Sequence, residues 1–544
     1  MIRNSLIAAA LAATALVGCT PKAATPRCPP GKLCLHSGNT AEPNSLDPHK
    51  ASLVSEDTII SEMLMGLTAD DAGARPIPGM ATHWETSADG KVWTFHLREA
   101  VWSDGVPVTA DDFVYAVRRL MDPKTAGEYA SLQYVIKGAE AANTGKGRLE
   151  DIGIRALDPR TLEITLEAPA PFLPELATHF TLFPVPRHVV EKWGDAWVQP
   201  EHYVGNGPFT LAENRLGDYV RLVKNPRFWD AGNVCLDELY FYPTRDAIAA
   251  ERRVKRGELH FNNDIQSNRI AFLRKPDQIP AYVQTGTRLG IAYLAFNNAV
   301  PAFKDQRVRE ALSMAIDREF ITGGLLRGGQ LPAYSFTPPG VADYPGGAKP
   351  YWAGWSLARR QAKARELLAA AGYGPNRPLK VDIKHRNSPD PMLFMPAIQA
   401  DWREVGVQAQ LTQNESQIAY AAYRARDFNI ADASWIADYN DAMSFLYLLD
   451  SSTGAQNYGD YKNARYDALI GAAKAERDAG RRADLLKSAE QLMLNEAAVA
   501  PVFFYVSKNL VSPEVTGFEN NVVDEHRRRF MCFKNAGAHR RGAV

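Results

Sequence analysis

The sequence predicts an α/β protein with more than one domain, and three observations support this fold class. Segments with the alternating pattern of a β-strand, such as "KVWTFHLRE" (91–99), occur among segments with apolar residues at helical spacing. In the second half the two kinds alternate, with strand "PLKVDIKHR", helix "MLFMPAIQADWREVGV" and strand "QAQLTQ" in succession. The chain has 544 residues, which exceeds one hydrophobic core and corresponds to about three domains.

The composition is that of an ordinary globular protein, with 46% hydrophobic and 23% charged residues. Lys plus Arg and Asp plus Glu both number 62, and this balance argues against a dedicated nucleic-acid-binding protein. Basic residues cluster only near the end of the chain, and we interpret Arg527–Arg529, Arg540 and Arg541 as a solvated tail.

The N-terminus has the features of an export signal. Arg3 precedes an apolar stretch from Leu6 to Val17, which is too short to span a bilayer as a mature helix. The stretch ends in Leu-Val-Gly-Cys19, which resembles a bacterial lipobox and implies cleavage before Cys19 and a diacylglycerol on its thiol. The alternative is an ordinary signal peptide followed by a chance cysteine. We therefore expect a signal peptide over 1–18, a tether over 19–34, and a lipid-anchored periplasmic protein.

Four cysteines remain after Cys19, and an even number in an exported protein suggests disulfides. Cys28 and Cys34 enclose "PPGKL", which lets the chain fold back, so we predict that they pair. Cys235 and Cys532 both lie in strand-like segments and would pair if those strands meet; the alternative is two buried free thiols. A metal site at Cys28, Cys34 and His36 has no suitably spaced fourth ligand, so no metal is expected.

The first half of the chain is read as strands with one clear helix. After strand 91–99, Thr109 is a suitable N-cap, and Asp111 and Asp112 fall in the first turn of a helix that starts there. A strand follows in "DPRTLEITLEAPAP". The segment "GPFTLAENRLGDYVRLVKNPRFWD" reads as a hairpin that turns at Gly217-Asp218.

The second half is richer in helix. The segment "DQRVREALSMAIDREFITGGLLRG" has apolar residues at helical spacing, and "LARRQAKARELLAAAGYG" should end at Gly372. Two helices and a closing strand are expected between Asn463 and Val506. No apolar run beyond residue 19 is long enough for a membrane span.

An enzyme is not indicated by any motif. The chain has no G-x-S-x-G, H-E-x-x-H or phosphate loop, and its 11 histidines lack metal-ligand spacing. Turn and helix-N-terminal roles explain Asp104, Asp111 and Asp112 better than catalysis does. We expect no catalytic residue and no cofactor, and a tethered binding protein is favoured.

A long segment, "WTFHLREAVWSDGVPVTADDFVYAVRRLMDP", is similar to the signature of the peptide-binding receptors of ABC transporters, the extracellular solute-binding proteins of family 5. Further segments resemble the oligopeptide receptors in the same order and at similar spacing: "SLDPHKA", "VGNGPFTLAENRLGDYVRLVKNPRFWD", "NNAVPAFKDQRVREALSMAIDRE", "LPAYSFTPP" and "WIADYNDAMSFL". The resemblance extends over nearly the whole mature chain.

The resemblance implies a three-domain periplasmic-binding-protein fold, in which two lobes close on the ligand and an extra domain packs against the first lobe. The chain would cross between the lobes near "TRLGIAYLAF" and "VFFYVSKNLV", and two short crossings suit a hinge. Projected onto this sequence, domain I comprises 35–64, 189–289 and 507–544, domain II 65–188, and domain III 290–506.

The resemblance also implies a ligand site. The aspartate of "WIADYND", Asp438, would hold the α-ammonium group of a peptide, because a buried ammonium needs an opposing carboxylate. The alternatives are that Asp438 caps a turn or pairs with an internal arginine. Val54 would offer backbone hydrogen bonds in the manner of an added strand, and Arg424 would meet a ligand carboxylate. Five further residues match groove positions, with core packing as the alternative for the aromatic ones: Tyr129, Asn262, Tyr293, Asn387 and Trp435. Ile436 completes the predicted site.

The sequence departs from the enteric oligopeptide receptors at several of these positions. Asp432 stands where they have a second arginine, Pro391 or Met392 where they have a histidine, and Gln417 where they have a groove tryptophan. Gly290 and Ile436 replace their cross-domain cysteine pair. The amine anchor is kept while anchors for the far carboxylate are partly lost, so the preferred peptide length stays open.

The sequence therefore predicts a lipid-anchored, monomeric oligopeptide receptor that delivers peptides to an inner-membrane ABC permease. A receptor for cell-wall or modified peptides is the alternative within transport. A secreted peptidase is the alternative from another class, and it would need a nucleophile–base pair or a metal.

Overall fold

The computed structural model describes residue 26 and residues 28–537. The predicted signal peptide, Cys19, most of the tether, Arg540 and Arg541 lie outside the described residues. Within the described part, none of the helices has the length and apolar character needed to cross a bilayer.

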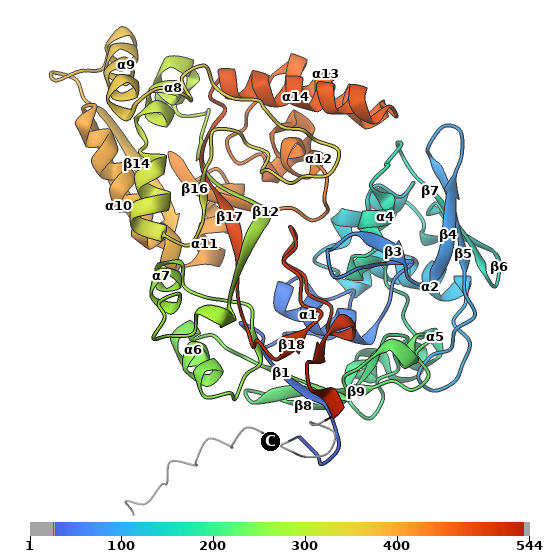
Figure 1. The fold of residues 1–544 in the computed structure, drawn as a ribbon. Coiled ribbons are helices and arrows are strands. Elements are labelled where there is room, and N and C mark those ends of the chain that lie inside the picture. The colour runs from blue at the N-terminus through green and yellow to red at the C-terminus, as the bar shows by residue number, and fades with distance from the viewer. Residues whose placement is uncertain (1–25, 27, 538–544) are drawn as a thin grey trace, which may run out of the picture.

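The largest element is an 11-stranded mixed sheet with the order β15-β14-β16-β12-β17-β11-β1-β10-β9-β8, to which β13 adds beside β17 (Figure 1). Its strands are β1 (Cys34–Gly38), β8 (Phe209–Arg215), β9 (Tyr219–Lys224), β10 (Glu238–Tyr242), β11 (Phe261–Asn262), β12 (Val283–Phe296), β13 (Leu331–Pro332), β14 (Leu379–Arg386), β15 (Val407–Asn414), β16 (Ile430–Ile436) and β17 (Val499–Val511).

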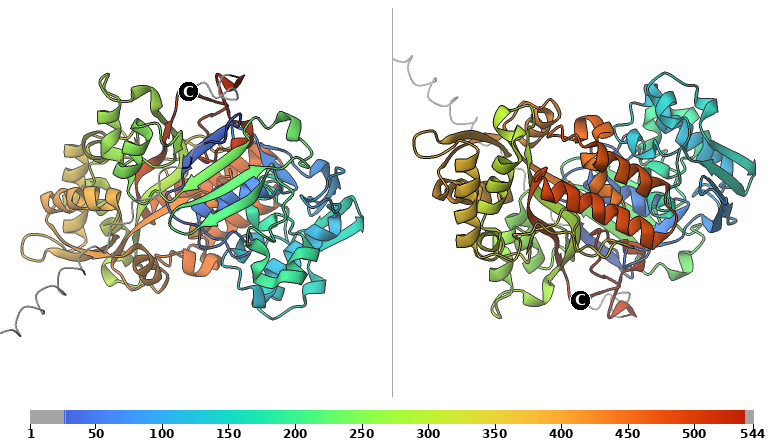
Figure 2. Two further views of the ribbon diagram at one scale, coloured as in Figure 1. Left: turned by 90° about the horizontal axis from the view of Figure 1, so that it is seen from below. Right: turned by 90° about the horizontal axis from the view of Figure 1, so that it is seen from above.

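A separate four-stranded antiparallel sheet has the order β4-β5-β7-β6, and two small ribbons pair β2 with β3 and β18 with β19. These strands are β2 (Thr68–Asp70), β3 (Pro76–Pro78), β4 (Ala81–Thr86), β5 (Val92–Leu97), β6 (Ile154–Asp158), β7 (Thr161–Thr165), β18 (Val515–Thr516) and β19 (Cys532–Phe533). Both views of Figure 2 place the yellow helices α8 and α9 and the blue-to-cyan strands β4–β7 at opposite ends of the molecule.

The α-helices of the described residues are α1 (Val54–Met63), α2 (Ala110–Met121), α3 (Ala139–Asn143), α4 (Leu173–Leu176), α5 (Arg187–Trp193), α6 (Ala247–Lys255), α7 (Ile270–Leu273), α8 (Gln306–Ala315), α9 (Leu357–Ala370), α10 (Pro389–Glu404), α11 (Ser416–Arg424), α12 (Met443–Leu446), α13 (Ala464–Ala475) and α14 (Ala479–Asn495).

Local sequence explains several of these boundaries. Thr109 is the N-cap of α2, and its backbone N–H donates to the Asp112 carboxylate at 2.8 Å, which confirms the predicted helix start. Gly217 has a positive φ of 74° in the turn between β8 and β9, and this confirms the predicted hairpin. Gly372, with φ of 86°, follows the C-cap of α9 as expected.

The helical spacing noted over 305–328 corresponds to two separate elements, because α8 ends at Ala315 and a π-helix (Phe320–Leu326) follows. Between them Ile316 is extended, and Arg318 is fully buried. The Arg318 guanidinium donates to the carbonyls of Ser313, Ala333 and Pro501 at 2.8–2.9 Å. A buried cation that binds carbonyls at the end of α8 therefore ends the helix there.

Strands β12 and β17 pair antiparallel along most of their lengths and form the middle of the large sheet. They cross the predicted domain boundaries at 289/290 and 506/507. Successive β12 residues enter two different cores: Ile291 and Tyr293 pack with α11–α14, while Ala292 and Leu294 pack with α8–α10. Alternate residues of the strand point to opposite faces of the sheet, and helices cover both faces.

The solvated tail expected at Arg527–Arg529 is wrong, because Arg528 and Arg529 are buried and the Arg527 side chain, 10% exposed, pairs with carboxylates that follow β1 in the chain. Arg527 lies 2.9 Å from Asp70, and the Arg528 backbone N–H donates to Glu62 at 2.7 Å. These interactions therefore connect the C-terminal segment, which follows β17 of the large sheet, to α1 and β2.

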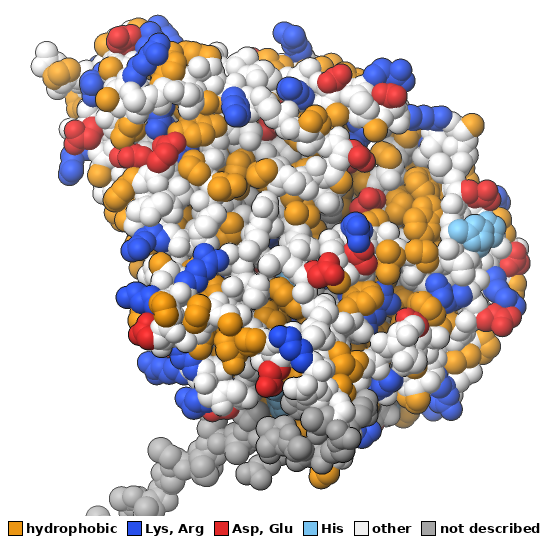
Figure 3. Space-filling view, in the orientation of Figure 1, with side chains coloured by type: hydrophobic (Ala, Val, Ile, Leu, Met, Phe, Trp, Pro, Cys, Tyr) orange, Lys and Arg blue, Asp and Glu red, His pale blue; other side chains and the backbone are white. Residues whose placement is uncertain are grey.

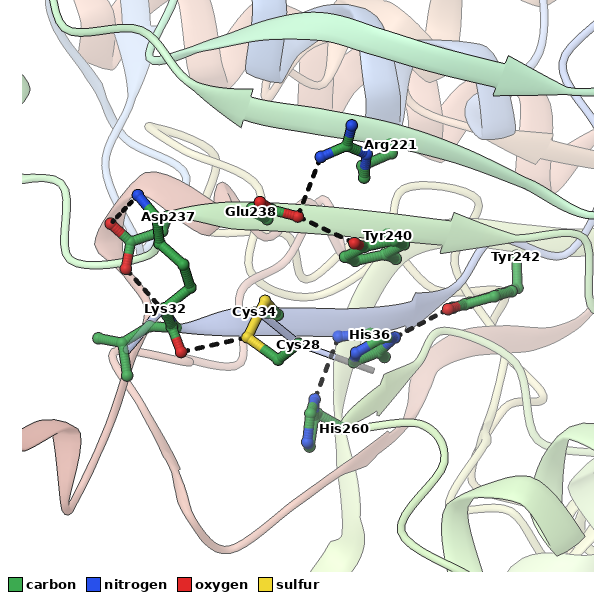
Figure 4. Close-up of a disulfide and its surroundings, with 11 residues drawn as sticks. Cys28, Lys32, Cys34, His36, Arg221, Asp237, Glu238, Tyr240, Tyr242 and His260 are labelled. Carbon is green, nitrogen blue, oxygen red and sulfur yellow. Dashed lines mark hydrogen bonds and ion pairs between the residues drawn. A yellow bond between two sulfur atoms is a disulfide. The ribbon is translucent and has the colours of Figure 1, made fainter. Parts of the chain in front are cut away.

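Two disulfides are present, and they have the predicted pairings. Cys28 bonds to Cys34 at the start of β1, with His36 and Tyr242 hydrogen-bonded further along (Figure 4). Cys235 bonds to Cys532, with Cα atoms 5.5 Å apart and a sequence separation of 297. The second bond links the segment before β10 to the C-terminal strand β19, so neither pair is left as free thiols.

Candidate functional site

Three connected cavities surround the end of β16, with volumes of about 590, 180 and 210 Å³. The first and second share the lining residues Tyr129, Asp438 and Tyr439, and the second and third share Val54 and Arg288. In Figure 3, hydrophobic and acidic side chains gather where the part with β12 and β16 faces the part with β4–β7.

The first cavity is mainly aromatic. Phe172 and Tyr439 stack across it with ring centroids 4.4 Å apart, and Trp435 meets Tyr447 edge to face at 5.9 Å. The buried Trp435 Nε1 has no hydrogen-bond partner among the described residues. The cavity thus offers apolar and aromatic walls with hydroxyl groups among them, which suits a ligand with apolar groups and carbonyl oxygens.

Asp438 lies immediately beyond β16, where the first two cavities meet. Its Oδ1 accepts a hydrogen bond from Tyr129 Oη at 2.8 Å, and its backbone N–H donates to Ser444 Oγ at 3.1 Å. No cation among the described residues lies within ion-pair distance of it. Burial raises the pKa of Asp438 to about 6, although the Tyr129 hydrogen bond opposes the shift.

The surroundings of Asp438 decide between the alternatives for its role. Its carboxylate neither pairs with an internal arginine nor caps a turn in the described structure, because Tyr129 is its hydrogen-bond partner. His179 stacks on Tyr129 at 5.6 Å, and burial lowers the pKa of His179 to about 4, so this imidazole is neutral at neutral pH. The site therefore has a partly buried carboxylate with no counter-ion among the described residues.

Val54 lines the second and third cavities with an exposed side chain, and the added-strand contact expected for it stays a prediction. Val54 is the first residue of helix α1, so its backbone is not extended. Just before it, the N–H groups of Ser52 and Leu53 donate to Glu56 Oε2 at 2.7 and 2.9 Å. This capping interaction uses the backbone donors of the two residues that precede Val54.

Trp435, Tyr129 and Ile436 lie at the cavities with Asp438. Ile436 pairs with Gly290 in the β12–β16 register, and a side chain on Gly290 would collide with it. The two positions that carry cysteines in relatives are therefore direct cross-strand neighbours here.

The other four predicted contact residues line none of the three cavities. Tyr293 is 3% exposed and packs against Phe336, so core packing accounts for it in this structure. Asn262 is 1% exposed in β11. Asn387 is exposed after β14, and Arg424 is exposed at the last residue of α11.

The departure at Asp432 has a structural explanation. Asp432 is fully buried on β16, and Arg386 on β14 binds it through two hydrogen bonds of 2.9 and 3.1 Å. The same guanidinium donates to Tyr420 Oη and Ser434 Oγ. A carboxylate in an otherwise apolar strand indicates that a cation lies nearby. Only the pairing of β14 with β16 identifies Arg386 as that cation.

Sequence reasoning missed four aromatic residues of the first cavity, namely Tyr134, Phe172, Tyr439 and Tyr447. Tyr439 and Tyr447 lie within and just after the segment "WIADYNDAMSFL", which was a usable signal. Phe172 lies far away in sequence, in "APAPF", and nothing local indicates that it stacks on Tyr439.

The model of the bacterial extracellular solute-binding proteins, family 5 (middle region), matches residues 75–457, and the chain belongs to this family. It is 37% identical over 529 residues to the periplasmic oligopeptide-binding protein OppA of Salmonella typhimurium, covering 95% of this chain and 96% of that protein. It is 35% identical to the periplasmic murein peptide-binding protein MppA of Escherichia coli, covering 90% and 91%.

Solved structures of peptide-binding proteins match the fold of this chain. Burkholderia pseudomallei OppA matches with a TM-score of 0.80 and 34% identity over 92% of this chain and 99% of that one. The murein tripeptide-binding protein MppA of Escherichia coli matches with a TM-score of 0.81 and 34% identity over 92% and 98%. The predicted family and the α/β fold of periplasmic peptide-binding proteins are thus confirmed.

The pKa of Asp438 predicts how amine binding varies with pH. A pKa of about 6 leaves the carboxylate ionised at neutral pH and largely protonated one unit below 6. Affinity for an ammonium ligand should therefore fall about tenfold between about pH 7 and about pH 5. Isothermal titration at several pH values measures it. In Asp438→Asn the affinity should be independent of pH; a wild-type profile that is equally flat would contradict the assignment.

Proposed function

We propose that this protein is an extracytoplasmic receptor that binds oligopeptides around Asp438 and delivers them to an ABC permease. The observation that carries the proposal is the partly buried Asp438 carboxylate, which has no counter-ion among the described residues and lies at the edge of a cavity of about 590 Å³. A peptide's α-ammonium group supplies the missing charge. The relatives named for oligopeptide and murein-peptide binding support this ligand class.

The geometry gives each contact a physical role. An ammonium beside Asp438 favours the ionised carboxylate and lowers its pKa, because opposite charges attract strongly where water is excluded. Tyr129 orients the carboxylate through its 2.8 Å hydrogen bond. The free Trp435 N–H can donate to a peptide carbonyl, and the aromatic walls accept side chains without selecting one shape.

Two variants of the ligand remain within the proposal. Ordinary oligopeptides and cell-wall peptides both present a free amine, so the Asp438 anchor suits either. Mass spectrometry of ligands that co-purify with the protein distinguishes them. Recovery of peptides with D-amino acids would favour the cell-wall alternative, and recovery of no amine-bearing ligand would contradict the proposal.

We also propose that the protein is not an enzyme and works without a cofactor. The lining residues are mainly aromatic and acidic, and no nucleophile–base pair is found among those described. No group of metal-ligating residues occurs in the described part of the chain. The protein should leave a peptide library uncleaved. Peptidase activity that remains with the protein through further purification would contradict this part of the proposal.

The proposed domain division is the one that the resemblance implies, with domain III closing on domain I. In this division strands β12 and β17, which pair with each other, would be the two crossings between domains I and III, and the first cavity would lie between residues of domains II and III. Contacts of Asp438 with Tyr129 and of Tyr439 with Phe172 bridge those two domains. Ligand contacts across the cleft would therefore stabilise a closed arrangement.

Closure predicts a smaller radius of gyration when peptide binds. Small-angle X-ray scattering with and without a saturating peptide measures it. The Asp438→Asn variant serves as the control, because it should need a much higher peptide concentration for the same change. An unchanged radius, with binding established by calorimetry, would contradict closure.

Lipid anchoring through Cys19 is proposed from the lipobox resemblance, with the permease as partner and a monomeric, periplasmic receptor as the working form. The Cys28–Cys34 disulfide holds the end of the predicted tether at the start of β1. Cys19→Ser should release the protein from the membrane fraction or block its processing. A variant that still partitions with membranes and migrates like wild type would contradict the lipoprotein assignment.

The amine anchor itself is tested by a double-mutant cycle. Asp438→Asn should weaken a free-amine peptide by about tenfold to a few thousandfold, since a charged hydrogen bond contributes about 1.5–3 kcal/mol and breaking a buried ion pair costs about 3–5 kcal/mol. Acetylating the peptide should weaken wild type similarly but cost the variant much less.

Glu140→Gln is the matched control for this cycle, because Glu140 also lines the first cavity and makes no ion pair with a described residue. It should leave the effect of acetylation unchanged. Additive losses in the cycle, or full affinity in Asp438→Asn, would show that the amine is held elsewhere.

A further inference from the structure

The cationic side chains of the first cavity are both held by carboxylates of the protein. Arg482 forms two hydrogen bonds with Asp441, at 2.6 and 2.9 Å. Lys474 lies 3.2 Å from Asp450. A ligand carboxylate in this cavity would have to displace one of these partners, and displacement from the buried Arg482 pair is costly.

The second and third cavities have the same property. Arg288 lies 3.6 Å from Asp524. Arg527 contacts Asp70 at 2.9 Å and also binds Glu525. Both guanidinium groups therefore lie beside a carboxylate of the protein, although the Arg288 contact is longer than a hydrogen bond.

Arg528 completes the set of cations that line the three cavities. It is 4% exposed and stacks on the ring of Phe261. Its terminal nitrogens donate to the His526 carbonyl at 2.5 Å and to Ser37 Oγ at 3.3 Å. A ligand has little access to this guanidinium.

Carboxylates on the same walls show the opposite pattern, since several form no ion pair with any described cation. Asp438 is one, and the Glu175 carboxylate has a buried oxygen with no hydrogen-bond partner in the described structure. The full set is Glu140, Glu167, Glu175, Asp264 and Asp438. Among the described lining residues, carboxylates without an ion pair are thus present, whereas each cation except Arg528 lies within 4 Å of a carboxylate.

Two cations outside the cavities leave this balance unchanged. Arg386 is held by Asp432 through two hydrogen bonds and is not a lining residue. Arg424 is exposed at the end of α11 and also lies outside the cavities.

We infer that this receptor recognises the amino end of its ligand and has no site for a terminal carboxylate. The inference rests on the proposed function and specifies its substrate class. The ligands are peptides with a free α-amine whose other end is amidated, otherwise blocked, or extends beyond the cleft. A terminal carboxylate contributes no ion pair and meets walls that already carry unpaired carboxylates.

Four versions of one peptide test the inference: free or acetylated at the amino end, combined with acid or amide at the carboxyl end. Calorimetric titration of wild type should give acid and amide affinities within about threefold of each other, the range expected where no buried ion pair forms. Acetylation should weaken binding by at least about tenfold, since it removes the charge that pairs with Asp438.

The Asp450→Asn variant tests whether freeing Lys474 from its carboxylate partner creates a preference for peptides with a free carboxyl end. The substitution removes the charge that neutralises Lys474 and keeps an oxygen for the backbone N–H of Ser452, which Asp450 caps at 2.9 Å. The variant should prefer the acid over the amide by about three- to tenfold, as for one partly exposed ion pair. Asp460→Asn is the matched control, because Asp460 pairs with Lys462 away from the cavities and should leave the acid-to-amide ratio at its wild-type value.

The outcomes separate the inference from the proposed function. An acid preference above about tenfold in wild type overturns the inference while peptide binding stands; if Arg424→Ala then removes that preference, Arg424 is the carboxylate site. An unchanged ratio in Asp450→Asn also overturns it, because the cavity charges would not set end selectivity. If none of the four peptides binds, the proposed function itself fails.

Discussion

The antiparallel pairing of β12 with β17 is the constraint on which the rest of the structure depends. These two long strands form the middle of the large sheet, so β16 and β14 extend it on one side and β11, β1 and β10 on the other. Alternate residues of β12 enter the two helix-covered cores. Because β16 pairs with β12 up to Ile436, the position of Asp438 is set by the register of this pair.

Buried charge is the second organising feature. Arg386, Arg482 and Arg527 are removed from water, and each is compensated by a carboxylate brought from a distant part of the chain. Breaking such a pair costs about 3–5 kcal/mol, so these pairs constrain how the elements pack. Asp438 departs from this pattern, and a partly buried group that the protein leaves uncompensated is a natural position for a ligand charge.

Much of the local structure could be predicted from the sequence. Thr109 with Asp112 marks the start of α2, Gly217 marks the β8–β9 turn, and Gly372 follows α9, because capping and positive φ depend on neighbouring residues alone. The features that the sequence did not predict involve distant partners. Arg527–Arg529 were read as solvated because Asp70 and Glu62 are more than four hundred positions away, and Arg318 ends α8 by binding carbonyls that include Pro501.

The sequence by itself determined the family, the α/β class and the presence of an acid beside apolar residues at Asp438, because each rests on a pattern contained in one segment or on a resemblance along the chain. Only the tertiary structure decided which charges are free. Asp432 and Asp438 are six positions apart and both lie in apolar surroundings, yet one is bound by Arg386 and the other by Tyr129 alone. The difference arises because ion pairing depends on which strands and helices are neighbours in space, and spacing along the chain does not specify that.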